Sequence, residues 1–356
     1  MDLTSRFSRL LTEEEFIDSP PWSKWPAQVI APIKPSQYGD LMAGDLVVTK
    51  HQGSFLRPCP ATPRYNCCGL NIFHFGQGCD LGCSYCILSA YLGTEAVIVF
   101  GNISDGLEAL KTRLDQMKLG LYQPLSGAPE PSYRFCTGEF TDSLLLDSQT
   151  KLSEKLIAIF RDRPPFILEL KTKTAEVDHL LNLDHGGRVV ISFSVNSLFI
   201  SQNFEPKAAP IIDRLKAAEK ASKYGYKIGL HFDPIVFYPG WERGYEDIIS
   251  QMAQILDSKA IAFISLGCFR YLPALKPVML KTRPSPLFNA EFIRGGDGKM
   301  RYPRPIRRLM YRRVLEFLKP LIHPTTKVYL CMESGRIWQE VFGFDPGTSG
   351  LTSMFK

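Results

Sequence analysis

Short apolar segments alternate with amphipathic segments along the middle of the chain. Apolar runs of strand length predict strands, and apolar residues at helical spacing, such as Leu152, Leu156 and Phe160, predict helices. The expected strands are 71–75, 96–100, 133–136, 166–170, 189–193, 228–232 and 261–266. The expected helices are 105–118, 152–161, 175–181, 211–224 and 245–256. This alternation is typical of βαβ units, so we predict an α/β fold with a parallel sheet, a partial (β/α)6 TIM-type barrel.

The segments on either side of this barrel lack the same alternation. We expect an N-terminal extension with a cysteine-rich loop over 1–70, the barrel over 71–272 and a basic region over 273–356. The first forty or so residues look irregular, because an acidic helix start is soon followed by a pair of prolines. In the last region, 292–302 predicts a β-hairpin with a glycine-rich turn, and 328–330 predicts a short strand.

Polar side chains lie at the ends of most predicted strands. They are Thr137, Gly138, Glu139, Thr141, Asp142, Ser143, Lys171, Thr172, Lys173, Ser194, Asn196, Ser197, His231, Asp233, Ser265 and Arg270. Sites in parallel α/β folds lie at the carboxyl ends of the strands. The sequence therefore predicts a polar pocket for a charged ligand at this end of the barrel.

Cys79, Cys83 and Cys86 form a C-x3-C-x2-C pattern in the loop after the first barrel strand. Three thiolates this close together can hold one metal centre, but they are one ligand short of a closed four-thiolate site. A three-cysteine 4Fe–4S cluster would leave one iron open to bind and polarise a small molecule. The alternatives are a zinc site completed by a distant ligand such as His74, or cysteines that are merely buried.

A second group of cysteines, Cys59, Cys67 and Cys68, lies upstream between glycine and proline residues. With Cys331 or Cys136 as a distant fourth ligand, these thiols predict a second metal site or iron–sulfur cluster. Adjacent cysteines are awkward ligands for a single metal, so small buried packing residues are the alternative.

Composition places the chain among ordinary globular proteins, with 356 residues and a net charge of +6. The N-terminus is polar and no stretch has the roughly 20 apolar residues of a membrane span. We therefore expect a cytoplasmic protein, where thiols stay reduced and nine cysteines favour metal or redox chemistry over disulfides.

The charge is unevenly distributed. Residues 276–330 hold thirteen Lys or Arg against three Asp or Glu, a net charge of +10, so the remainder is slightly acidic. A basic region suits an anionic partner such as nucleic acid. The alternative is a helix face whose charges lie in water.

Several motifs in order resemble the spore photoproduct lyase family of radical S-adenosylmethionine (SAM) proteins. They are Cys79, Cys83 and Cys86 with Tyr85, then Lys173 ahead of 177–181, then 193–197, 203–206 and 240–245. The resemblance implies an enzyme that uses a 4Fe–4S cluster to cleave SAM to a 5′-deoxyadenosyl radical. In the family this radical removes hydrogen from a thymine dimer of spore DNA, after a one-electron reductant such as flavodoxin or ferredoxin has supplied the electron.

The resemblance also implies roles for individual residues. Lys173 and Ser194 match the family's contacts to SAM, and Thr141 stands where the family has a serine. Gly138 belongs to a segment similar to the Gly-Gly-Glu stretch that receives the SAM amino group, and Asn196 is a further candidate at the next strand end. Tyr85, inside the cysteine motif, is a candidate for the chemistry itself.

Two departures from the family pattern leave the substrate open. Glu139 stands where the repair enzymes keep a cysteine that returns hydrogen to the product, and Ile87 stands where they keep a tyrosine. His231 and Asp233 occupy a strand end expected to be apolar in those enzymes. Glu139, His231 and Asp233 are therefore candidates to bind or deprotonate a different substrate, although a structural hydrogen bond is an alternative for the last two.

Three hypotheses follow from these observations. The first is repair of a DNA photoproduct, and the second is radical modification of a non-DNA substrate. The third is a non-catalytic, metal-containing protein that binds nucleic acid. In the basic region, family members grip DNA with a hairpin beside the barrel, so the candidate contacts are Arg301, Tyr302, Arg304, Arg307 and Arg308. Arginines would neutralise phosphates, and Tyr302 or Tyr311 would stack on an exposed base.

Overall fold

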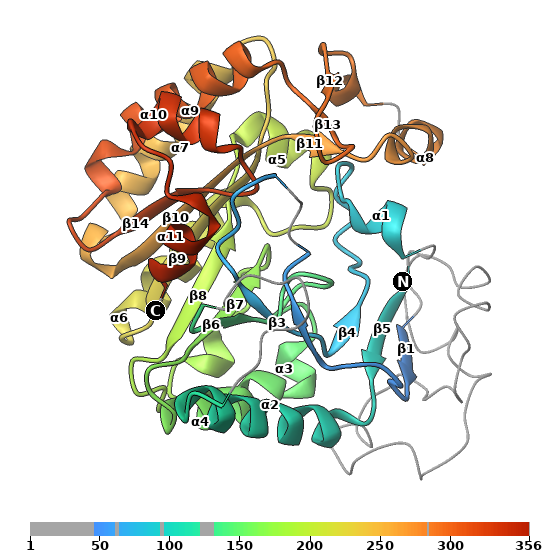
Figure 1. Cartoon of the computed structure of the whole chain (residues 1–356), viewed down its shortest axis with the longest axis vertical. Helices are drawn as coiled ribbons and strands as arrows, with labels where there is room; N and C mark the ends of the chain where they lie inside the picture. The colour runs from blue at the N-terminus through green and yellow to red at the C-terminus, as the bar shows by residue number, and fades with distance from the viewer. Residues whose placement is uncertain (1–45, 61–63, 93–95, 122–131, 283–284, 356) are drawn as a thin grey trace.

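A curled sheet of eight strands forms the centre of the molecule (Figure 1), in the order β14-β10-β9-β8-β7-β6-β3-β2. The computed structural model describes residues 46–60, 64–92, 96–121, 132–282 and 285–355. The predicted irregular extension at residues 1–40 lies outside the described residues. The strands of this sheet are β2 (Leu56–Pro58), β3 (Asn71–Phe73), β6 (Arg134–Cys136), β7 (Ile167–Thr172), β8 (Val189–Ser194), β9 (Lys227–Ile235), β10 (Ile261–Cys268) and β14 (Lys327–Leu330).

The six strands from β3 to β10 are parallel and follow one another in chain order. This arrangement confirms the predicted partial (β/α)6 barrel. Two further strands extend the sheet at its edges, β2 antiparallel to β3 and β14 parallel to β10. The strands formed where they were predicted because their residues are buried on both faces, as in β8, where all six are buried.

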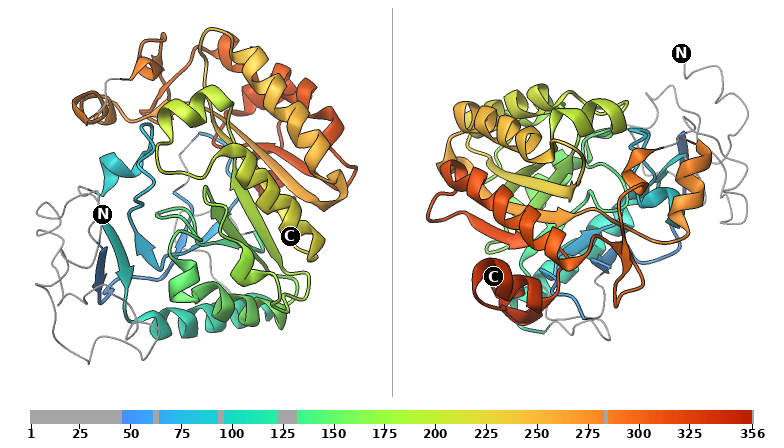
Figure 2. Two further views of the ribbon diagram at one scale, coloured as in Figure 1. Left: turned by 180° about the vertical axis from the view of Figure 1, so that it is seen from behind. Right: turned by 90° about the horizontal axis from the view of Figure 1, so that it is seen from above.

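Helices cover the outer face of this sheet (Figure 2). Their apolar stripes pack on the strands, with α4 on β7, α6 on β8 and β9, and α9 on β10. The helices of the barrel region are α1 (Leu88–Tyr91), α2 (Ile103–Lys118), α3 (Asp147–Thr150), α4 (Leu152–Arg161), α5 (Leu198–Phe204), α6 (Ile211–Lys223) and α7 (Trp241–Ile255). The later helices are α8 (Leu275–Thr282), α9 (Arg304–Leu318), α10 (Gly335–Phe342) and α11 (Gly347–Ser353). No helix among the described residues is long and apolar enough to cross a bilayer.

The helix predicted over 175–181 is wrong. Only a 3₁₀ turn, Asp178–Leu180, forms there. The hydroxyl of Thr172 accepts a hydrogen bond from the Thr174 amide, and the hydroxyl of Thr174 accepts one from the Glu176 amide. These local bonds engage the backbone N–H groups just ahead of the predicted helix and compete with helix formation.

Two small sheets flank the main one. The strand predicted over 96–100 forms β5 (Val97–Phe100), but it pairs with β1 (Leu46–Thr49) and β4 (Gly76–Gln77) and not with the barrel. The predicted hairpin forms from β12 (Ile293–Arg294) and β13 (Met300–Arg301), joined by β11 (Arg270–Tyr271).

The two ends of the curled sheet are linked by a loop contact. The amide of Asn66, in the loop before β3, donates to the carbonyl of Glu333, which follows β14, at 2.9 Å. This single antiparallel bridge brings the cysteine-rich loop against the last strand of the sheet.

Candidate functional site

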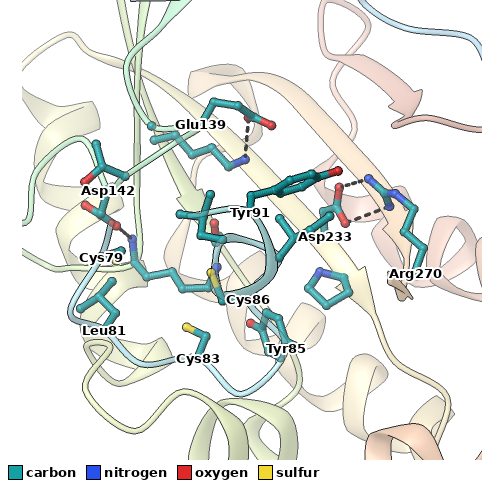
Figure 3. A pocket seen from close by; sticks show the side chains of 18 of the residues that line it. Cys79, Leu81, Cys83, Tyr85, Cys86, Tyr91, Glu139, Asp142, Asp233 and Arg270 are labelled. Carbon is teal, nitrogen blue, oxygen red and sulfur yellow. Dashed lines mark hydrogen bonds and ion pairs between the residues drawn. The ribbon is translucent and has the colours of Figure 1, made fainter. Parts of the chain in front are cut away.

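The cysteine motif lies between β4 and α1 and opens into a pocket of about 240 Å³ at the carboxyl ends of the strands (Figure 3). Its lining includes Cys79, Cys83, Cys86, Gly138, Glu139, Thr141, Asp142, Lys171, Thr172, Lys173, Ser194, Asp233, Arg270 and Lys299. The structure thus brings most of the polar strand-end residues together with the three thiols, as predicted. The roles of individual side chains stay predictions.

Backbone hydrogen bonds hold the loop that carries the thiols at its start and again near its middle. Gly78 has φ +87°, and its N–H donates to the carbonyl of Phe140 at 2.9 Å. A Cβ at this position would lie 2.0 Å from the carbonyl oxygen of Ala96, so only glycine fits. Further along, the Ser84 amide donates to the carbonyl of Phe204 at 2.8 Å.

Tyr85 anchors the centre of the loop to the barrel. Its hydroxyl donates a short hydrogen bond to Glu205, whose other carboxylate oxygen pairs with Arg214 at 2.5 Å. Arg214 also donates to the carbonyls of Ser194 and Ala209, at 2.8 and 2.7 Å. Burial disfavours the Glu205 carboxylate, but the positive charges of Arg214 and Lys173 outweigh burial and hold the pKa of Glu205 below its ordinary value.

The sequence analysis missed the roles of Glu205 and Arg214. Glu205 lay within a motif that resembled the family, but no pattern pointed to Arg214 as its partner. The hydroxyl of Tyr85 is directed at Glu205 and the residue is buried, so the structure gives this candidate a clear anchoring contact.

Asp142 fixes the strand end that carries Lys173. Its carboxylate accepts hydrogen bonds from the Lys173 amide at 2.7 Å, from the Thr172 hydroxyl at 2.7 Å and from the Leu144 amide at 3.0 Å. The Lys173 ammonium lies 5.7 Å from the centre of the Tyr85 ring, inside the pocket. Asp142 thereby determines where the Lys173 backbone leaves the strand.

Gly138 lies where the second barrel strand meets the third. A Cβ there would be 2.7 Å from the carbonyl oxygen of Lys171 and 2.8 Å from the Ser143 hydroxyl. Any larger residue would push these strand ends apart. Gly138, Thr141, Lys173 and Ser194 all line the pocket, in keeping with the predicted SAM contacts.

Asn196 does not line the pocket, and the structure contradicts its prediction as a cofactor contact. It is 1 % exposed. Its side-chain amide donates to the carbonyl of Pro234 at 2.8 Å, and its oxygen accepts from the Tyr245 hydroxyl at 2.7 Å and from the Ser197 amide at 3.0 Å. These bonds satisfy a buried polar side chain and hold the turn after β8.

Two ion pairs line the side of the pocket that faces away from Cys83, and we call this side the charged wall (Figure 3). Asp233 and Arg270 make a two-bond pair at 3.1 and 3.0 Å, whereas Glu139 and Lys171 are 3.8 Å apart. Burial alone would raise the pKa of Asp233, but Arg270 holds it below its ordinary value. Burial alone would lower the pKa of Lys171, but Glu139 and further negative groups raise it. Asp233, Arg270 and Lys171 are therefore charged at neutral pH.

His231 lies behind this wall, so its prediction as a residue of the main pocket is wrong. Its Nε2 is 2.7 Å from Glu169, which also pairs with Arg134 at 3.4 Å inside the barrel. Burial, followed by the charge of Lys171, lowers the pKa of His231. Burial disfavours the charged form of Glu169, yet Arg134 and His231 lower its pKa to about 2.

The second group of cysteines borders a separate cavity of about 60 Å³, which His231 also lines. Cys59, Cys67, Cys68 and Cys331 all contribute to its wall, whereas Cys136 does not. Of the two distant candidates for a fourth thiol, the structure brings in Cys331. All nine cysteines lie in the described residues and none forms a disulfide.

The predicted nucleic-acid contacts are largely internal, and three of the five are wrong. Arg301 is 2 % exposed and pairs with Asp297 at 2.5 Å and with Glu333 at 3.5 Å. Arg307 is buried against Glu333 at 3.0 Å. Tyr302 is 1 % exposed, and its hydroxyl accepts a hydrogen bond from the backbone N–H of Phe237, two residues after the end of β9.

The remaining two arginines are partly exposed on α9. The side chains of Arg304 and Arg308 are 42 % and 47 % exposed, and both lie near Glu340 of α10, at 3.6 and 3.9 Å. Tyr311, the other predicted stacking residue, is buried and accepts a hydrogen bond from the Cys268 amide. The positive charge of this region is thus partly neutralised by its own acidic residues, chiefly Glu333 and Glu340.

Comparison with known proteins agrees with this geometry. Residues 71–293 match the family model described as spore photoproduct lyase. The chain belongs to the spore photoproduct lyase family. It is 33 % identical over 181 residues to the spore photoproduct lyase of Geobacillus sp. (strain Y412MC61), covering 51 % of this chain and 50 % of that protein. It is 29 % identical over 213 residues to that of Bacillus subtilis (strain 168), covering 59 % of each.

The matched region therefore spans half to three fifths of the length of these curated relatives of the spore photoproduct lyase family.

Solved structures extend the likeness in fold. A mutant spore photoproduct lyase with bound AdoMet and dinucleoside spore photoproduct has a TM-score of 0.68 and 24 % identity, covering 84 % of this chain and 85 % of that one. Spore photoproduct lyase complexed with the dinucleoside spore photoproduct has a TM-score of 0.67 at 23 % identity, with the same coverage. The predicted radical SAM fold is confirmed.

The buried Glu205–Arg214 pair predicts a large effect on stability. Arg214→Met leaves the Glu205 carboxylate buried without its counter-charge, so we expect the free energy of unfolding to fall by about 3–5 kcal/mol. Urea unfolding followed by circular dichroism measures this change. As a control, Lys223→Met removes an exposed pair with Glu219 and should cost about 0.5 kcal/mol or less. Equal, small losses for both variants would contradict the anchoring role.

The low pKa of Glu169 predicts acid sensitivity. A carboxyl group whose pKa is about 2 when folded, against an ordinary 4.5, stabilises the fold above pH 4.5, and that contribution is lost as the pH falls toward 2. Glu169→Gln should therefore flatten the decline in melting temperature over this range. The exposed residue Glu108 provides the control, since Glu108→Gln should keep the wild-type slope. A Glu169→Gln variant with an unchanged slope would refute the assignment.

Proposed function

We propose that this protein is a radical SAM enzyme whose cluster is held by Cys79, Cys83 and Cys86. The observation that carries the proposal is that the three thiols open into the same pocket as Lys173 and Ser194, at the carboxyl ends of the barrel strands. We take 71–272 as the catalytic unit, with 1–70 and 273–356 as appended regions.

The donor set fits a 4Fe–4S cluster better than a zinc ion. Tetrahedral structural zinc needs four ligands, usually thiolates or imidazoles, and the described residues that line this pocket include three thiols, no fourth thiol and no histidine. His74, the candidate fourth ligand, does not line the pocket and packs between Phe100 and Phe140. Burial lowers its pKa to about 3. Three thiolates without a fourth protein ligand match a cluster with one open iron.

When bound, the cluster and SAM supply one-electron cleavage of SAM and removal of hydrogen from a substrate. The chain supplies the contacts. Lys173, positioned by Asp142, would pair with the methionyl carboxylate, and the hydroxyls of Ser194 and Thr141 would complete its hydrogen bonds. Gly138 and Glu139, which line the same pocket, would receive the methionyl amino group, as the family segment that they resemble implies. Support for SAM as the cofactor comes from the related fold that carries bound AdoMet.

For the substrate, the family favours a DNA photoproduct. The relatives are spore photoproduct lyases, and a protein of similar fold binds the dinucleoside spore photoproduct. Any lesion must leave the duplex stack to enter a pocket at the mouth of a barrel, at a cost of a few kcal/mol. A one-electron reductant such as flavodoxin or ferredoxin is the partner that this chemistry requires.

The charged wall favours a second candidate, radical modification of a polar, non-DNA substrate. Glu139 stands where the family resemblance predicts a hydrogen-returning cysteine. It pairs with Lys171, and Asp233 and Arg270 line the same pocket. The burial of Arg301, Tyr302 and Arg307 also removes most of the expected grip on DNA.

One assay separates the two candidates. The reconstituted protein is reduced anaerobically with SAM, and 5′-deoxyadenosine is quantified with and without DNA that carries the thymine photoproduct. Release stimulated by damaged DNA, with thymine restored, supports repair. Release that is indifferent to DNA supports the second candidate, and no release at all overturns the proposed activity.

Cys83→Ala should abolish both the visible absorbance of the iron–sulfur cluster and SAM cleavage. The reason is that two thiolates do not hold the cluster. Absorbance, iron content and 5′-deoxyadenosine release are measured together. Cys268→Ala, which removes a buried thiol outside both groups of cysteines, is the control and should retain all three. Cleavage that persists in Cys83→Ala would disprove the site.

Lys173→Ala should weaken SAM binding tenfold or more, about 1.4 kcal/mol or above, while leaving the iron content unchanged. The ammonium lies in the pocket but is no cluster ligand. Equilibrium dialysis with labelled SAM measures the affinity. Lys207→Ala, which removes an exposed pair with Asp80 outside the pocket, is the matched control. A loss of iron in Lys173→Ala, or an unchanged affinity, would contradict the assignment.

A further inference from the structure

Four thiols from distant parts of the chain border one interior cavity. Cys59 follows β2, Cys67 and Cys68 precede β3, and Cys331 follows β14. The bridge between Asn66 and Glu333 holds the segment of Cys67 and Cys68 against the segment of Cys331. The Cys59 amide donates to the carbonyl of Leu70 at 2.8 Å, and the Cys331 amide to that of Leu266 at 2.7 Å. The backbone thus fixes all three segments around the cavity.

The four thiols line one small cavity of about 60 Å³. Cys67 and Cys68 are buried, while Cys59 and Cys331 are partly exposed. Thiol groups are weak donors and weak acceptors, so contacts between them contribute little to folding. Packing alone would be served as well by alanine or valine at such positions.

Two guanidinium groups approach the sulfur atoms. Arg134 donates to the Cys68 sulfur at 3.1 Å, and Arg270 to the Cys331 sulfur at 3.7 Å. Arg134 is 2 % exposed. Its Nε and Nη1 atoms are buried with no hydrogen-bond partner in the described part of the protein, although Nε lies 3.4 Å from Glu169. Both guanidinium groups already face a carboxylate, Glu169 for Arg134 and Asp233 for Arg270, and thiolates would give their N–H groups further charged acceptors.

We propose that Cys59, Cys67, Cys68 and Cys331 bind a second metal centre through their thiolates, either a zinc ion or an iron–sulfur cluster. Four thiolates are the soft ligand set that both centres prefer. N–H donors to the sulfur atoms, as from Arg134 and Arg270, are the outer contacts that stabilise thiolate ligands. Binding releases the four thiol protons to solvent.

The side chains must turn for this centre to form. No three potential ligands in the described residues already converge on a single metal ion, and this holds for the group of Cys79 as well as for the group of Cys59. Metal-bound thiolates point to a common centre, so the four side chains rotate toward the middle of the cavity when the centre forms.

The location gives the centre a structural role. It would tie the loop before β3 to the strand end after β14, next to Arg270 and Lys171 of the charged wall. The inference concerns different cysteines from those of the proposed SAM site, so each can fail without the other.

The test uses the full chain with Cys79, Cys83 and Cys86 all changed to Ala, purified anaerobically after reconstitution with iron and sulfide or after growth with added zinc. Zinc, iron and sulfide per chain are measured, with electron paramagnetic resonance of the reduced protein. We expect either about one zinc or about four irons per chain to remain. Adding Cys68→Ala or Cys331→Ala should lower that content at least fivefold, and adding Cys268→Ala, the matched control, should leave it unchanged.

Circular dichroism establishes that each variant is folded, and wild-type stoichiometry gives a second measurement that needs no variant. A chain with a second centre should hold about eight irons, or about four irons and one zinc. A triple variant without bound metal, together with about four irons and no zinc in the wild type, would overturn this inference and leave the proposed SAM site intact. Metal that persists in the triple variant, with no SAM cleavage by the wild type, would support the second centre and overturn the proposed SAM site. Metal that is unaffected by Cys68→Ala and Cys331→Ala would also overturn it.

Discussion

The buried contact between Glu205 and Arg214 is the constraint on which the pocket depends. A loop that must present three thiols to one centre has no regular hydrogen-bonding pattern of its own. Here its middle residue, Tyr85, reaches a carboxylate that is itself held by a guanidinium, and the guanidinium also binds the end of β8 through Ser194. The thiol loop and the strand end that carries a predicted SAM contact are thereby fixed to each other.

A buried charge pair of this kind adds little net stability over an apolar contact of equal size, because desolvation offsets much of its attraction. What the pair determines is the orientation of the loop. A phenol, a carboxylate and a guanidinium satisfy one another in few geometries, so the loop has one favoured position. The same reasoning applies to Asp142. Its carboxylate accepts two hydrogen bonds from its own loop and two from Thr172 and Lys173 at the end of β7, and so determines the exit of Lys173.

The sequence predicted the elements whose evidence is local, and failed where the answer depended on a partner far along the chain. Strands and most helices followed from apolar spacing, and the pocket from polar strand ends. Arg301 and Arg307 looked like a basic face by helical spacing, but Glu333 lies near them only in the fold. Asn196 and His231 stand at strand ends like the pocket residues, yet their side chains bind Pro234 and Glu169 instead. Polarity at a strand end does not determine which way a side chain faces.

The bridge between Asn66 and Glu333 has a consequence for how the molecule is made. The curled sheet is closed by a contact between the loop that joins β2 to β3 and the residues just after β14, so the cavity wall is incomplete until residues 331–333 have left the ribosome. Pairings between such distant residues form late in folding, because a large loop must close first. Until then the cysteines of the early loop stay open to solvent, which makes synthesis the period in which their chemistry is most exposed.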